Sequence, residues 1–333
     1  MELLNRKKTG KVERPVKVLQ FGEGNFLRAF VDYMIDIANE QGKFNGDIVL
    51  VKPIEFGSLD RFHDQECQYT VQLRGIVDGE PKRINRIVTS VADAVDAYGE
   101  YQKYADYAKL DSLRYIVSNT TEAGIVYDDT DRLEMEPPKS YPGKLTKFLY
   151  ERYKHFNGAM DKGLVMLPVE LIDDNGIHLK ECVEKLAVLW NLEDGFKTWL
   201  DEACVFTSTL VDRIVTGYPR DEAEELCKEF GYQDNLIVTG EPFALWVIES
   251  AKDISKEFPL PDAGLPVIFT DNQKPYKQRK VRILNGAHTS FVLASYLCGN
   301  DIVLESMQDE LIFNFMKATI FDEVIPTLTL PKQ

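Results

Sequence analysis

The sequence is poor in the residues that build metal and disulfide sites. Its only four histidines are His63, His155, His178 and His288, and they form no HExxH or other paired spacing. The five cysteines are odd in number and scattered, and no two have CxxC spacing. Zinc sites and disulfide frameworks depend on such spacings. We therefore expect reduced thiols and a protein that works without a metal.

The chain also lacks an excess of positive charge and a long apolar run. Its 333 residues include 39 Lys and Arg against 54 Asp and Glu, which gives a net charge of −15. Duplex binders need a basic surface, so nucleic acid is a poor partner for this chain. No apolar run reaches 18 residues, and residues 1–14 lack the apolar core of a signal peptide. We expect a cytoplasmic protein without a membrane partner, either a monomer or a small homo-oligomer.

What the chain does have is a repeated alternation of strand and helix patterns. A β-type run, a glycine turn and a periodic helix open the chain, and an inserted hairpin with its turn at Asp78 and Gly79 interrupts the series. This order predicts an α/β fold, a Rossmann-like doubly wound parallel sheet with helices on both faces. The expected strands are 16–21, 47–52, 69–77, 83–91, 114–118, 163–167 and 203–207, and the expected helices are 29–39, 142–154 and 177–190.

After about residue 270 the strand signals give way to helical periodicity, over 280–298 and 307–321. We therefore divide the chain into a Rossmann-like nucleotide-binding domain, 1–270, and the start of a mainly α-helical domain that carries substrate and catalytic residues, 271–333. The sequence stops just after Pro331, a residue type that often opens a helix. We expect the helical domain to be truncated at this point.

The glycine turn is the first candidate site. Gly22 and Gly24 would let the backbone turn tightly and approach a pyrophosphate at the positive end of the next helix. The pattern is incomplete, because Leu27 replaces the third glycine, and a plain strand-to-helix turn explains it equally well. After the second strand, Lys52 would suit the 2′-phosphate of NADP, whereas Glu55 would suit the ribose hydroxyls of NAD. The residues alone leave this choice open.

The second candidate is a polar trio in the helical region. If a helix begins at Lys280, Asn285 and His288 lie about 140° and about 80° around its axis from that lysine, so all three can face one cleft. A partly buried lysine near a helix N-terminus can act as a general acid or base, while the other two orient the reacting oxygen. A surface lysine with two unrelated polar neighbours is the alternative. The locally unfavourable pair Asn285 and Gly286 inside an apolar helix favours the functional interpretation.

Further polar residues follow the ends of predicted strands, where open α/β sheets bind ligands. They are the stretch 118–124, Glu170, and the adjacent charges Asp212 and Arg213. Lys144 lies in the first turn of a predicted helix. Ordinary loops, a structural ion pair and solvent-facing charges are the alternative explanations.

Taken together, these motifs resemble the polyol-specific long-chain dehydrogenase family typified by mannitol 2-dehydrogenase. Lys280, Asn285 and His288 match its signature of Lys, four residues, Asn, two residues and His, and the stretches 21–28 and 211–214 match in order. Over 20–32, 118–124, 208–221 and 284–289 the chain is most similar to members that act on altronate. The resemblance implies NAD-dependent, metal-free interconversion of D-tagaturonate and D-altronate in bacterial hexuronate catabolism. Such members are longer at the C-terminus.

The resemblance also implies roles for individual residues. Lys280 would protonate the ketone oxygen, and Asn285 and His288 would polarise and orient it. Asp212 would lie near the nicotinamide ribose or the substrate. The cofactor contacts carried over are Gly22, Gly24, Asn25, Phe26, Leu27, Arg28, Asn119 and Asp212.

Two departures from the mannitol enzyme pattern concern the substrate. Lys277 replaces a glutamate three residues before Lys280, and Leu171 replaces an asparagine after Glu170. A basic residue at 277 suits a substrate with a carboxylate. We therefore assign substrate binding to Lys277, Arg213 and Glu170, with Arg220 as another candidate for the carboxylate. Reduction of the epimeric fructuronate, a mannitol dehydrogenase-like polyol oxidoreduction, and a non-catalytic NAD- or sugar-acid-binding protein are the alternatives.

Overall fold

The structure is a computed structural model that describes residues 1–121 and 123–328. Glu122, within the 118–124 stretch, and residues 329–333, which include Pro331, lie outside the described residues. The chain divides into two compact units, Met1–Thr270 and Asp271–Gln333.

The first unit is built on a six-stranded parallel sheet with the order β5-β2-β1-β6-β7-β8. This is the strand order 3-2-1-4-5-6 of a dinucleotide-binding Rossmann sheet, in which the order reverses between the first and fourth strands, here β1 and β6. The predicted Rossmann-like sheet is confirmed. Its strands are β1 (Val16–Phe21), β2 (Asp47–Lys52), β5 (Val91–Asp96), β6 (Tyr115–Ser118), β7 (Val165–Pro168) and β8 (Val205–Phe206).

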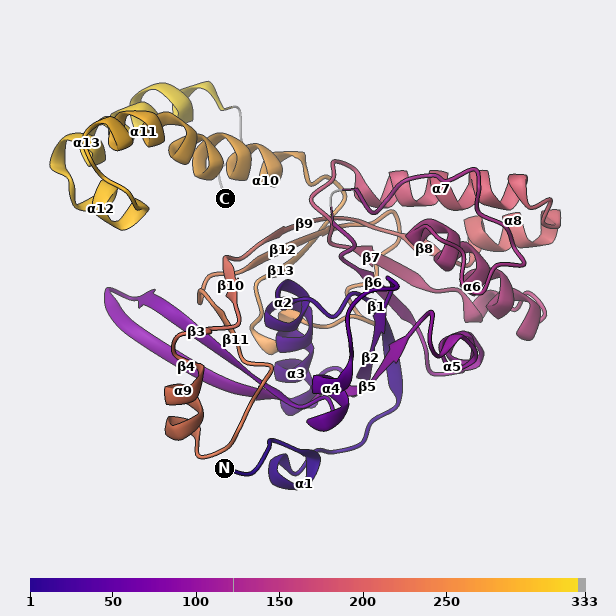
Figure 1. Cartoon of the computed structure of the whole chain (residues 1–333). Helices are drawn as coiled ribbons and strands as arrows, with labels where there is room; N and C mark the ends of the chain where they lie inside the picture. Colours follow the sequence, from indigo (N-terminus) through magenta and orange to yellow (C-terminus); the bar gives the residue numbers. More distant parts are fainter. Residues whose placement is uncertain (122, 329–333) are drawn as a thin grey trace. The chain divides into compact units, whose positions relative to one another are not determined.

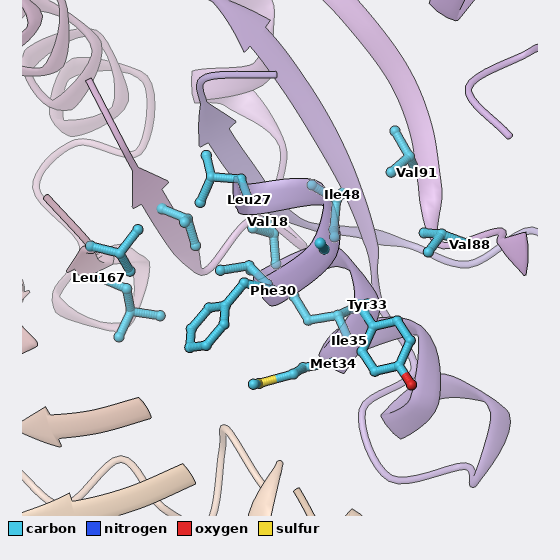
Figure 2. Close-up of a cluster of buried hydrophobic side chains, with 14 of the residues drawn as sticks. Val18, Leu27, Phe30, Tyr33, Met34, Ile35, Ile48, Val88, Val91 and Leu167 are labelled. Carbon is cyan, nitrogen blue, oxygen red and sulfur yellow. The ribbon is translucent and has the colours of Figure 1, made fainter. Parts of the chain in front are cut away.

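Both faces of this sheet are buried, because alternate residues of each strand enter different cores. Val18 and Ile48 pack with Phe30 and Met34 on one face, as Figure 2 shows. Leu19 and its neighbours pack on the other face against α6 (Tyr141–His155), α7 (Asn175–Leu189) and α8 (Asp194–Glu202). Figure 1 shows these three helices grouped beside β6, β7 and β8.

The edge strand β5 of this sheet was not predicted, and the strand that precedes it in the chain was predicted three residues too late. The expected strand 83–91 is β4 (Glu80–Val88), which pairs with β3 (Tyr69–Val77) in the predicted hairpin. The chain then breaks and starts β5. Asp36 fixes the break, because its carboxylate accepts hydrogen bonds from Thr89 N (2.7 Å), Thr89 Oγ1 (3.0 Å) and Ser90 Oγ (2.9 Å). The Rossmann sheet thus gains its edge strand only after the inserted hairpin.

Two smaller sheets complete the first unit. One has the order β10-β11-β3-β4, and the other has the order β13-β12-β9. The sequence patterns predict only the hairpin strands of these sheets. Their remaining strands are β9 (Ser208–Asp212), β10 (Val215–Gly217), β11 (Val238–Gly240), β12 (Leu245–Glu249) and β13 (Val267–Thr270).

The helix after β1 is continuous but changes its winding. It runs as α2 (Asn25–Leu27), a π-helical segment η1 (Arg28–Asp32) and α3 (Tyr33–Glu40). Short π-helical stretches inside α-helices occur frequently at functional sites. The other helices of this unit are α1 (Arg6–Thr9), α4 (Asp60–Asp64), α5 (Tyr101–Asp106), η2 (Tyr107–Lys109), η3 (Met160–Lys162), α9 (Ala223–Phe230) and η4 (Pro261–Ala263).

The second unit is helical over its described residues. Its first helix runs as α10 (Lys274–Arg279), the π-helical segment η5 (Lys280–Asn285) and α11 (Gly286–Leu297). It continues with α12 (Val303–Gln308), α13 (Glu310–Ala318), a third π-helical segment η6 (Thr319–Val324) and η7 (Ile325–Thr327). Across 1–121 and 123–328, no helix has the length and apolarity needed to cross a membrane.

Candidate functional site

The glycine turn lies at the carboxyl end of β1, beside the point where the strand order reverses. Gly22 has φ +117°, and a Cβ at that position would lie 3.1 Å from the backbone oxygen of Asn119. Gly24 precedes the first helical residue, and a Cβ there would meet no protein atom within 4 Å. Gly22 is thus required by the turn itself, whereas Gly24 leaves the helix N-terminus open to an approaching group. Such a turn fits the pyrophosphate of a dinucleotide.

The residues after the turn divide into exposed and buried ones. Asn25 is exposed, and its Oδ1 accepts a 2.6 Å hydrogen bond from Nη2 of the buried Arg28. Arg28 also donates from Nη1 to the carbonyl of Leu236 at 2.6 Å. Leu27 is buried, and Phe26 stacks on Phe30 at a centroid distance of 5.0 Å. The arrangement favours a supporting role for Leu27 and Arg28, in which Arg28 orients the amide of Asn25, over the predicted direct cofactor contact.

The loop after β6 is held by Glu170, which is 2% exposed. Its carboxylate accepts hydrogen bonds from Ser118 Oγ (3.1 Å), Thr120 N (3.0 Å) and Thr120 Oγ1 (2.9 Å). Burial raises the pKa of Glu170, and these hydrogen bonds oppose the rise. Asn119, at the centre of this loop, is half-buried and donates its N–H to Phe21 O at 3.1 Å. Glu170 is engaged by the protein itself, which favours a role in shaping the loop over substrate contact.

The adjacent charged residues at the end of β9 differ in burial. Asp212 is the half-buried last residue of β9. Arg213 is 8% exposed and donates to the backbone carbonyls of Ala29, Phe243 (3.0 Å) and Pro242 (3.1 Å). A guanidinium that serves three protein carbonyls fixes the backbone around it. The structure therefore does not favour the predicted contact between Arg213 and a substrate carboxylate.

A cavity of about 610 Å³ opens at the carboxyl end of the sheet. Its volume is typical of a site for a small molecule or cofactor. It spans the ends of β2 and β6, on either side of β1. The residues that shape it include Pro53, Ile54, Thr120, Val126, Tyr141 and Lys144.

Lys144 is a buried cation on this cavity. Its Nζ donates to the carbonyl of Lys139 at 2.6 Å and to the hydroxyl of Tyr98 at 3.1 Å. Burial lowers the pKa of Lys144 to about 8, although Asp131 and Glu55 favour its charged form. The sequence analysis placed Lys144 in the first turn of a helix, and α6 indeed begins at Tyr141. Its burial could not be read from the sequence.

In the helical unit, the start of the helix differs from the prediction. The helix begins at Lys274, with Pro275 in its first turn, so Lys280 lies in its second turn. Lys280 is therefore not at the N-terminus of the helix, and that part of the prediction is wrong. The missed signal was Pro275, since proline is common at the first helical positions.

Lys280 and Asn285 are the two ends of the π-helical segment, and ideal π-helical winding would bring them closer together around the helix axis than an α-helix would. A π-helix joins residues i and i+5 and turns by about 80° per residue, so five residues separate the two by about 40° instead of about 140°. Asn285 and His288 are both exposed, and the His288 ring lies 5.8 Å from the Phe291 ring. Lys277 and Lys280 are half-buried on the same helix. The four predicted residues of this unit therefore share one helix, with the π-helical segment spanning Lys280 to Asn285.

No cluster of three or more potential metal ligands occurs among His, Cys, Asp and Glu in the described part of the chain. All five cysteines are unpaired thiols, and only Cys298 is exposed.

Comparison with known proteins places both units in one family. The profile of the mannitol dehydrogenase Rossmann domain matches residues 16–261, and that of the mannitol dehydrogenase C-terminal domain matches residues 272–333. An altronate oxidoreductase of Phocaeicola vulgatus is 44% identical over 333 residues, which are 100% of this chain and 70% of the relative. The altronate oxidoreductase of Yersinia enterocolitica is 46% identical over the same length, 69% of the relative.

Solved structures agree on the fold. Pseudomonas fluorescens mannitol 2-dehydrogenase, solved as a ternary complex with NAD and D-mannitol, superposes with a TM-score of 0.78 at 23% identity, over 99% of this chain and 70% of that one. A D-sorbitol dehydrogenase in substrate-free form gives a TM-score of 0.82 at 21% identity, over 99% and 71%. Because both domain profiles match and the relatives align with the whole of this chain, the chain belongs to the mannitol dehydrogenase family.

Proposed function

We propose that this protein is an NAD-dependent oxidoreductase that reduces D-tagaturonate to D-altronate in hexuronate catabolism. The observation that carries the proposal is the 44–47% identity to altronate oxidoreductases over essentially the whole chain. The trio Lys280, Asn285 and His288 supports it, because those residue types suit proton transfer to a ketone oxygen. The unpaired cysteines suit a cytoplasmic location, where thiols stay reduced.

The first unit would hold the cofactor. The glycine turn accepts a close pyrophosphate at Gly24, and Asn25 presents an amide whose orientation Arg28 fixes. The cavity that reaches the ends of β2 and β6 has room for the adenosine half. When bound, NADH supplies the hydride that reduces the substrate carbon. The turn, the strand order and the cavity together fit a dinucleotide.

The helical unit would supply the proton. The ammonium of Lys280 donates a proton to the ketone oxygen as the carbon accepts hydride, so the ketone becomes a secondary alcohol and the lysine regains its proton from water. Asn285 and His288 would donate hydrogen bonds to that oxygen and stabilise the charge that develops on it. The π-helical segment supports this grouping, because it spans Lys280 to Asn285 and ideal π-helical winding would turn these two residues toward similar sides of the helix.

The test is the loss of NADH absorbance on addition of D-tagaturonate, with D-fructuronate and fructose in parallel. We expect turnover of tagaturonate, and a fall in kcat of about 10² to 10⁴ in Lys280→Met, which is typical of a lost general acid. Lys317→Met is the matched control, since Lys317 is an exposed lysine of the same unit on α13. Preference for fructuronate or fructose would reassign the substrate. NADH binding without reduction of any of the three would favour a non-catalytic binding protein.

A further inference from the structure

The loop after β2 has its carbonyl groups turned inward onto one lysine. Lys52, the last residue of β2, is 1% exposed. Its Nζ donates to the backbone carbonyls of Ile54 (2.9 Å), Glu55 (3.3 Å) and Phe56 (3.3 Å). Three consecutive carbonyls on one ammonium fix the path of the loop.

A carboxylate on the neighbouring strand holds the same lysine. Asp96 ends β5 directly opposite Lys52 in the parallel pairing, and its Oδ2 lies 3.1 Å from Lys52 Nζ. Its Oδ1 accepts a 2.9 Å hydrogen bond from Tyr98 N. Burial raises the pKa of Asp96, but the backbone N–H groups of Tyr98 and Gly99 and the Lys52 ammonium outweigh it, so the net shift is downward. Lys52 therefore faces a charged, fixed carboxylate.

Because the carbonyls point inward, the loop side chains point outward. Ile54 is 53% exposed and Phe56 is 77% exposed, although both are apolar. Pro53 and Ile54 form part of the wall of the 610 Å³ cavity, as do Thr120 and Val126 from beyond β6. The lysine thus sets the shape of a cavity wall that it does not itself line.

We propose that Lys52 is a positioning residue for the adenosine half of the cofactor, and that its engagement selects the cofactor without a 2′-phosphate. The inference rests on the proposed function. A cation near the end of the second Rossmann strand is the group that would accept a 2′-phosphate. Here that cation is occupied by three carbonyls and Asp96, and the Asp96 carboxylate places a negative charge 3.1 Å from it. The sequence left open whether Lys52 binds the 2′-phosphate of NADP or Glu55 binds the ribose hydroxyls of NAD. The contacts of Lys52 favour NAD.

Direct binding measurements test the positioning role. We expect Lys52→Met to raise the Kd for NADH, followed by cofactor fluorescence, at least tenfold, while kcat at saturating NADH stays within twofold. Lys43→Met should bind NADH as the unchanged protein does, because Lys43 is an exposed lysine in the turn after α3. An NADH Kd for Lys52→Met within twofold of the unchanged protein would overturn the positioning role.

Asp96→Asn tests the selectivity and also covers the case in which Lys52→Met fails to fold. The amide keeps the acceptor for Tyr98 N–H but removes the negative charge. We expect the ratio of the NADPH Kd to the NADH Kd to fall at least fivefold. Equal weakening of both cofactors, with the ratio unchanged, would overturn the selectivity. If the unchanged protein bound neither cofactor, the proposed function would fail instead.

Discussion

Lys277 is the residue that we propose binds the substrate's carboxylate. Lys277 lies half-buried one turn before Lys280, on the helix that also carries Asn285 and His288. A hydrogen bond to a charged group contributes about 1.5–3 kcal/mol, or roughly tenfold to a hundredfold in affinity. We therefore expect Lys277→Ala to raise the KM for tagaturonate by that factor with little change in kcat, in steady-state assays. Lys277→Arg should retain most of the affinity. An unchanged KM in Lys277→Ala would remove Lys277 from the substrate site.

Asp32 is a buried acid whose charge is disfavoured by the fold. Its Oδ2 accepts a 2.6 Å hydrogen bond from the hydroxyl of Tyr69, while Oδ1 is buried with no hydrogen-bond partner among the described residues. Burial raises the pKa of Asp32 to about 7, against the opposing effects of Tyr69, Gln20 and Arg28. The protonated form therefore fits the fold better than the charged form.

The sign of the pH effect follows from that shift. Since the folded-state pKa is above the unfolded value, protonation of Asp32 stabilises the fold fully below about pH 4, and this stabilisation is lost as pH rises toward 7. Each unit of pKa difference corresponds to about 1.4 kcal/mol. We expect Asp32→Asn, which cannot ionise, to gain stability relative to the unchanged protein between pH 5 and pH 8 in urea unfolding. A stability difference between the two proteins that does not vary with pH would show that Asp32 does not titrate in this range.

At the scale of elements, we expect the two glycines of the turn to have different roles, Gly22 in folding and Gly24 in cofactor binding. Alanine at Gly22 would be strained by φ +117° and would press on the Asn119 carbonyl, which costs about 1–3 kcal/mol. Alanine at Gly24 would meet no protein atom within 4 Å, so stability should stay within about 0.5 kcal/mol. Its methyl group would instead occupy the space of the pyrophosphate and raise the Kd for NADH at least tenfold. Thermal unfolding and NADH titration of both variants check this contrast. Unchanged NADH binding in Gly24→Ala would move the pyrophosphate away from the turn.

Whether an element was predictable depended on how continuous its pattern is. β1 and β2 were placed with correct ends, because each is an apolar run bounded by polar or turn residues. β5 was missed because Val91–Asp96 mixes small and acidic residues, and its pairing with β2 is set by the sheet. The helix start at Lys274 was missed although Pro275 marks it. The change to π-helical winding at Lys280 has no signal in the periodicity.

Site residues were predictable as residue types at strand ends, but their partners were not. Nothing in the sequence distinguishes Arg213, held by three carbonyls, from an arginine that faces substrate. The same holds for Lys52, whose ammonium is closed in by its own loop and Asp96. The partners of such a side chain depend on contacts between segments far apart in the chain, such as that of Arg28 with Leu236. Local pattern carries no information about them.

At the scale of the whole molecule, the first unit contains the turn, the cavity and complete cores. Among the described residues, three clusters of buried hydrophobic side chains occur, all within residues 1–270, and the last residue packed against them is Phe269. A domain with its own core can fold alone. We therefore expect a chain of residues 1–270 to unfold cooperatively and to bind NADH with a Kd within threefold of the full chain. It should reduce no tagaturonate, because Lys280, Asn285 and His288 are absent.

A folded 1–270 chain that fails to bind NADH would show that the helical unit contributes to cofactor binding. Measurable reduction by the same chain would show that the proton comes from a residue of the first unit, and would take the role of general acid away from Lys280.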